Sequence, residues 1–67
     1  MDLKKVLQIV RSEKHLSQKE LANRIGITPQ TYNAWENNPE RLRIDQVDKI
    51  AAALKIPTST IVRMWDI

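Results

Sequence analysis

The stretch that decides the fold is residues 16–36, LSQKELANRIGITPQTYNAWE, which holds two helix starts with one helix end between them. Ser17 and Glu20 have the spacing of a capping box, in which side chains satisfy the free N–H groups of a helix start. Gly26 is the only glycine in the chain and predicts a left-handed residue that ends this helix. Thr28 and Pro29 then predict a second start, because threonine caps helices and proline suits the first helical position. Two short helices are therefore expected, joined by a tight turn, with the second over about residues 29–37.

Helical spacing continues on both sides of this stretch, and no segment alternates with the period of a strand. Asp2 is suited to cap a first helix that runs to about Lys14. A loop over residues 38–43 precedes a fourth helix, and Pro57 separates that helix from a short last one. The apolar positions that define the first and fourth helices are Leu3, Val6, Leu7, Val10, Val47, Ile50, Ala51 and Leu54. The sequence therefore predicts an all-α chain.

Length and composition exclude several classes of function. A chain of 67 residues has room for one small core, so residues 1–67 are expected to form a single domain. With no cysteine and only His15 as histidine, disulfides, thiolate metal sites and multi-histidine sites are excluded, and no cofactor is expected. No acid–base pair or nucleophile triad is present, so enzymatic activity is not expected. The absence of a long apolar run predicts no membrane contact and a cytoplasmic protein.

The formal net charge is +3, and the positive excess lies entirely within residues 1–43. A basic face suits a polyanionic partner such as nucleic acid. The alternative is an ordinary solvated helix surface, since many such surfaces are mildly basic. Charge therefore favours a nucleic-acid partner without selecting it.

The outward side of the predicted helix 29–37 has an unusual composition. At about 100° per residue, Tyr32 and Trp35 point to one side with Glu36 beside them. The opposite side carries Gln30, Asn33, Ala34 and Asn37, with neither lysine nor glutamate. Amides can make paired hydrogen bonds with adenine, and a methyl group can contact the thymine methyl. This side is suited to reading bases, the alternative being an amide-rich solvated face.

Residues 16–36 resemble the helix-turn-helix of the Cro and phage-repressor family (XRE-like regulators), and the similarity continues through residues 50–54. The resemblance implies a five-helix, lambda-repressor-like domain that binds a double-stranded DNA operator as a two-fold homodimer and represses transcription in a phage or mobile element. A small-molecule ligand is not evident. A hypothesis of another class is an antitoxin-like module that neutralises a partner protein, because one fold can serve both roles.

The resemblance also implies which residues meet DNA. Base contacts would come from Pro29, Gln30, Asn33 and Ala34, with Gln30 the strongest candidate because proline and alanine offer no polar group. Phosphate contacts would come from Gln18, Lys19, Thr28, Asn37, Arg41 and Arg43. The two arginines could instead belong to a merely solvated loop.

Two further expectations follow from the resemblance. It implies a structural salt bridge between Arg11 and Glu36, which would otherwise both be solvated. It also favours a dimer interface through Met64, Trp65 and Ile67, although this tail could simply close the core, with Trp65 partly inside it. Because the family often has glycine at the positions of His15 and Asn38, these two residues are expected at helix ends, where they tolerate left-handed backbone.

Overall fold

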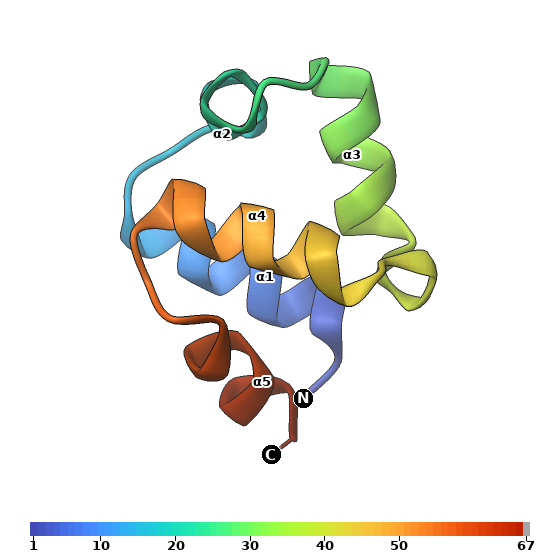
Figure 1. Cartoon of the computed structure of the whole chain (residues 1–67), viewed down its shortest axis with the longest axis vertical. Helices are drawn as coiled ribbons and strands as arrows, with labels where there is room; N and C mark the ends of the chain where they lie inside the picture. The colour runs from blue at the N-terminus through green and yellow to red at the C-terminus, as the bar shows by residue number, and fades with distance from the viewer. Residues whose placement is uncertain (67) are drawn as a thin grey trace.

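Five α-helices and one short 3-10 helix make up the computed structural model, which describes residues 1–66 and contains no strand in that range (Figure 1). The all-α prediction is therefore confirmed. The elements are α1 (Leu3–Glu13), α2 (Gln18–Ile25), α3 (Pro29–Asn37), η1 (Pro39–Arg41), α4 (Ile44–Leu54) and α5 (Thr58–Asp66). The expected loop over residues 38–43 contains η1, a tight turn that Pro39 begins.

Side-chain caps set the helix starts as the sequence predicts. The Asp2 carboxylate accepts from the Lys5 backbone N–H at 2.9 Å. At α2 the Ser17 hydroxyl accepts from the Glu20 N–H, and the Glu20 carboxylate accepts from the Ser17 N–H, both at 3.0 Å. The Thr28 hydroxyl accepts from the Thr31 N–H at 3.1 Å, so α3 starts where the Thr-Pro pair places it.

Left-handed backbone ends three of the helical segments. Gly26 has φ 91° and turns the chain between α2 and α3. His15, at φ 57°, takes the left-handed conformation expected of it, and Lys55, at φ 59°, does so after α4. Asn38 ends α3 with φ −128° instead, so a left-handed residue there is not observed. The following proline explains this, because it disfavours helical backbone in the residue before it.

The helices surround one apolar core. In Figure 1, α2 and α3 lie on one side of the paired helices α1 and α4, and α5 lies on the opposite side beside the N-terminus. Ala22 is fully buried, and its small side chain lets α2 and α3 approach each other closely. The core residues are Leu3, Val6, Leu7, Val10, Leu16, Leu21, Ala22, Tyr32, Val47, Ile50, Ala51, Leu54 and Ile61. This core holds the α2–turn–α3 unit at one end of the molecule with its outer side free.

Helix α5 differs from expectation at Trp65. Ile61 is buried and Met64 packs against the core, one helical turn along the same side. Trp65 follows about 100° further round and is 51% exposed, so the expectation that it partly closes the core is wrong. Ile67 lies outside the described residues. No helix in residues 1–66 is long and apolar enough to cross a membrane.

Candidate nucleic-acid interface

Helix α3 presents two chemically different sides. Tyr32 and Glu36 are buried against the core, with 0% and 1% of their surface exposed. Trp35 is half-buried at the edge of this side. Gln30, Asn33, Ala34 and Asn37 are all exposed on the other side, as the helical spacing predicts. The turn directs this outward side away from the core, where a groove of nucleic acid could reach it.

A buried ion pair ties α3 to α1. The Arg11 Nε and Nη2 atoms donate to the two carboxylate oxygens of Glu36, at 3.1 Å and 3.0 Å. A further Arg11 nitrogen donates to the Leu16 carbonyl oxygen at 2.9 Å, just ahead of α2. This two-point geometry is the strong form of an arginine–carboxylate contact. One side chain therefore fixes the position of α3 relative to α1 and to the start of α2.

The surroundings of Glu36 keep it charged. Burial alone would raise the pKa of this carboxyl, but the hydrogen bonds and the positive charge of Arg11, with a smaller contribution from Gln18, lower it overall. The pKa of the Arg11 guanidinium is raised, mainly by its hydrogen bonds to Glu36. Burial raises the pKa of the neighbouring Tyr32 phenol well above its ordinary range. The pair is therefore ionised at neutral pH.

Three amide side chains form a chain of hydrogen bonds across the outward surface. Asn37 Nδ2 donates to Asn33 Oδ1 at 2.9 Å, one helical turn away. Asn33 Nδ2 donates to Gln18 Oε1 at 3.0 Å, which joins α3 to the start of α2. The structure thus brings together one predicted base-contact residue and two predicted phosphate-contact residues.

The remaining predicted residues of this surface are accessible. Lys19, Thr28, Pro29 and Gln30 are exposed around the start of α3. The Thr28 hydroxyl lies 2.8 Å from the Thr31 hydroxyl and also caps the helix, so it is held in one place. No acceptor or donor within residues 1–66 engages the Gln30 side chain, which leaves its amide available to a ligand.

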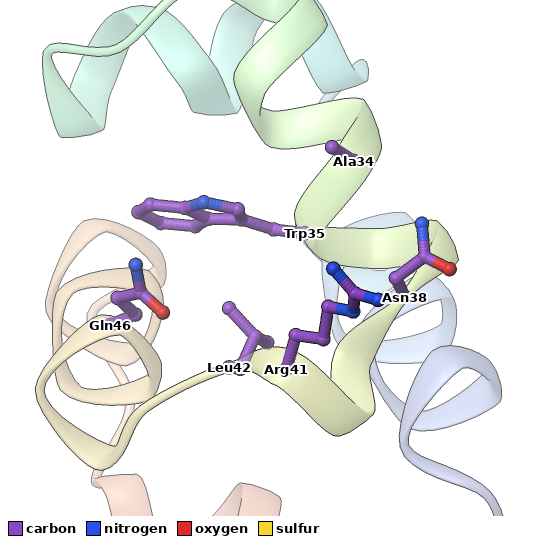
Figure 2. A pocket seen from close by; sticks show the side chains of 6 residues that line it. All are labelled: Ala34, Trp35, Asn38, Arg41, Leu42 and Gln46. Carbon is purple, nitrogen blue, oxygen red and sulfur yellow. The ribbon is translucent and has the colours of Figure 1, made fainter.

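An open hollow of about 500 Å³ borders this surface, between the end of α3, η1 and the start of α4 (Figure 2). Trp35 extends above Gln46 and Leu42 on one side of it, and Arg41 lies beside Asn38 on the other. Gln46 Oε1 accepts from the Arg43 backbone N–H at 2.9 Å, which leaves the Gln46 amide nitrogen free to donate. None of the residues 1–66 that line the hollow is acidic, so its polar groups suit an anion.

The two loop arginines are placed differently. Arg41 lines the hollow, whereas Arg43 precedes α4 and pairs with Asp45, Nε to Oδ1 at 3.2 Å. Both side chains of this second pair are mostly exposed, at 73% and 55%, so Arg43 can readily exchange Asp45 for another partner. Trp35, Asn38 and Gln46 also line the hollow, and none of them was expected at the interface from the sequence. The spacing of Gln46 three residues after Arg43 was the available signal, because it is the spacing of a capping box.

Comparison with known proteins agrees with this geometry. A family model described as "Helix-turn-helix" matches residues 7–61, which is most of the chain. The chain is also 34% identical over 53 residues to the Cryptic phage CTXphi transcriptional repressor RstR of Vibrio cholerae. That alignment covers 79% of this chain and 48% of the relative, so the chain spans about half the length of the curated relative that it matches. Within residues 1–66, no group of histidine, cysteine and acidic residues could hold a metal ion.

Proposed function

Because the chain belongs to the helix-turn-helix family, of the Cro and phage-repressor type, we propose that it binds double-stranded DNA in a sequence-specific manner and regulates transcription. The observation that carries this proposal is the outward side of α3, whose exposed amide and methyl groups match the edges of A·T base pairs in the major groove. In this proposal α3 lies in the groove, and Pro29, Gln30, Asn33 and Ala34 face the bases.

Phosphate contacts supply most of the affinity in the same proposal. Gln18 and Lys19 sit at the start of α2, where backbone N–H groups and the helix dipole favour an anion. Thr28 lies at the start of α3, Arg41 lines the hollow of Figure 2, and Arg43 precedes α4. Gln46 and Asn38 add hydrogen-bond donors beside Arg41. Since each neutralised phosphate releases counterions, affinity is expected to fall steeply with salt.

We further propose that the chain acts as a repressor and binds as a two-fold dimer. The relative's printed name, a phage transcriptional repressor, supports repression. Exposed apolar groups on α5, Val62 at 41% and Trp65 at 51%, lie one turn apart and support a dimer surface that includes Met64. A two-fold dimer would place its two α3 helices about one DNA turn, roughly 34 Å, apart. Sedimentation of the wild type and of Trp65→Ser, with and without DNA, tests this surface.

Selection of bound duplexes from a random DNA pool tests the proposed function as a whole. The expected result is an approximately palindromic motif with a half-site of a few base pairs, whose preferences change in Gln30→Ala. Gln30 is exposed and has no hydrogen-bond partner within residues 1–66, so this variant should fold as the wild type does. Weak, salt-sensitive binding with no enriched motif would contradict sequence-specific regulation and favour a protein partner instead.

A further inference from the structure

Asn33 already has hydrogen bonds on two sides without any ligand. Its amide oxygen accepts from Asn37 Nδ2 at 2.9 Å, and its amide nitrogen donates to Gln18 Oε1 at 3.0 Å. The side chain is nevertheless exposed on the outward side of α3. An amide held in this way loses little rotational freedom when it binds a further group, which favours recognition.

The hydrogen-bonding groups that remain unused on Asn33 match adenine. A side-chain amide has two hydrogens and two oxygen lone pairs, and the two bonds use one of each. One N–H donor and one acceptor lone pair remain. Adenine presents the complementary pair in the major groove, an acceptor at N7 and a donor at N6.

The two hydrogen bonds give the amide chain one direction. Asn37 donates to the Asn33 oxygen, and Asn33 Nδ2 donates to Gln18 Oε1, so the Gln18 oxygen faces Asn33 and accepts from it. Reversing the chain would exchange the donor and acceptor of Asn33 and mismatch the same adenine.

Resting on the proposed function, we infer that Asn33 reads a single adenine through its remaining N–H donor and its remaining acceptor lone pair. In this inference Asn37 is a positioning residue that holds the Asn33 amide. Asn37 is thereby assigned to base recognition instead of the phosphate contact that its position in the motif implies. Its bond to Asn33 occupies one N–H, and its distance of one helical turn keeps it on the same side of α3. Gln18 acts in both base recognition and phosphate contact, because its oxygen orients Asn33 and its amide nitrogen can donate to a phosphate.

Binding titrations with four variants test this inference on the duplex selected by the wild type. Each protein is titrated with that duplex and with duplexes in which one base pair is replaced, over a range of salt. For the wild type, replacing the adenine read by Asn33 is expected to weaken binding about tenfold or more. Asn33→Ala should remove this discrimination, and Asn37→Ala should reduce it several-fold at the same base pair, leaving the salt slope unchanged. The double variant Asn33→Ala/Asn37→Ala should match Asn33→Ala, because Asn37 acts through Asn33.

Arg41→Ala is the matched control, since a lost phosphate contact should weaken binding to all duplexes alike and lower the salt slope by about one. If Asn37→Ala behaves in this way, or leaves both discrimination and slope unchanged, its positioning role is wrong. If Asn33→Ala still discriminates against replacement at every base pair as the wild type does, the assignment of Asn33 to an adenine is wrong. These failures differ from failure of the proposed function, in which the wild type itself prefers no sequence.

Discussion

The two sides of α3 carry similar polar chemistry and use it for different ends. On the inner side, Glu36 is 1% exposed, and both of its oxygens accept from Arg11. On the outer side, Asn33 is exposed, and its amide is bonded on two sides with one donor and one acceptor left over. Both oxygens of the Glu36 carboxylate have hydrogen-bond partners within the protein. The Asn33 amide is held in one orientation but has one donor and one acceptor without a partner within residues 1–66.

This difference separates stability from recognition along a single helix. A buried charge must be satisfied internally, because an uncompensated one costs several kcal/mol. The unused donor and acceptor of an exposed amide can hydrogen-bond to water, and a base edge can replace that water at little cost in free energy. Gln18 joins the two sides, since it contacts Asn33 and contributes to the charged state of Glu36. Substitutions on the two sides should therefore affect different measurements.

The largest expected effect is that of Arg11→Ala on stability. Removing Arg11 leaves the Glu36 carboxylate buried without its partner, so the free energy of unfolding should fall by about 3 kcal/mol. Urea denaturation followed by circular dichroism measures this. Asp45→Ala, which breaks the exposed pair with Arg43, is the matched control and should cost at most about 1 kcal/mol. Equal losses in the free energy of unfolding for Arg11→Ala and Asp45→Ala would contradict the contrast between the buried and the exposed ion pair.

The next effect is that of Gln30→Ala on DNA affinity. Loss of a paired amide contact should weaken binding to the preferred duplex by about tenfold and relax the preference at one base pair. Fluorescence anisotropy on matched and mismatched duplexes measures both quantities. The free energy of unfolding should stay within about 0.5 kcal/mol of the wild type, because the side chain is exposed. A variant that lost affinity only together with stability would instead assign Gln30 to the inner, structural side.

A smaller effect is expected from pH. The pKa of Glu36 is lowered in the folded chain, so the stability that its charge contributes is present above its ordinary value of about 4.3 and is lost as the pH falls below it. Urea midpoints measured from pH 6 to pH 3 should therefore decline. Glu36→Gln should flatten this decline.

The matched control for the pH series is Glu20→Gln. Hydrogen bonds from the Ser17 backbone and side chain lower the pKa of Glu20, but this group is exposed at the start of α2. Its variant should flatten the acid decline less than Glu36→Gln does. An unchanged acid decline in Glu36→Gln would show that the buried ion pair does not govern stability in acid.

The smallest effect is that of Asn33→Ala on stability. Alanine favours a helix interior more than asparagine by about 0.5 kcal/mol, which offsets the loss of the exposed amide bonds. The thermal midpoint should therefore stay the same or rise slightly, although base discrimination is lost. A clear destabilisation would mean that the amide chain of Gln18, Asn33 and Asn37 is itself a structural element.

The sequence was sufficient for the starts of α1, α2 and α3 and for the two sides of α3. Capping residues such as Ser17 and Thr28 act locally, so their pattern alone locates the helix starts. Periodicity identified Tyr32 and Glu36 as the inner side because burial follows helical spacing. Asn38 lies at the end of α3 as expected, but with φ −128° instead of the left-handed backbone found at His15.

The details of the site depend on contacts that spacing does not specify. The bond from Asn33 to Gln18 joins two helices, and residue spacing within either helix does not specify it. Trp65 follows Met64 directly, and only the angle at which α5 packs decides which of the two faces the core. The hollow beside Arg41 arises from the path of η1 and the placement of Trp35, which sequence patterns do not fix.

Nuclear magnetic resonance titration with the selected duplex tests most directly whether the outward side of α3 binds DNA. The side-chain amide signals of Gln18, Gln30, Asn33 and Asn37 report on the surface itself. We predict that these four signals shift or broaden together with the backbone signals of residues 28–34 and 41–46, while α5 changes only through dimerisation. Unchanged α3 amide signals, with the perturbations gathered elsewhere on the molecule, would contradict DNA recognition by this helix.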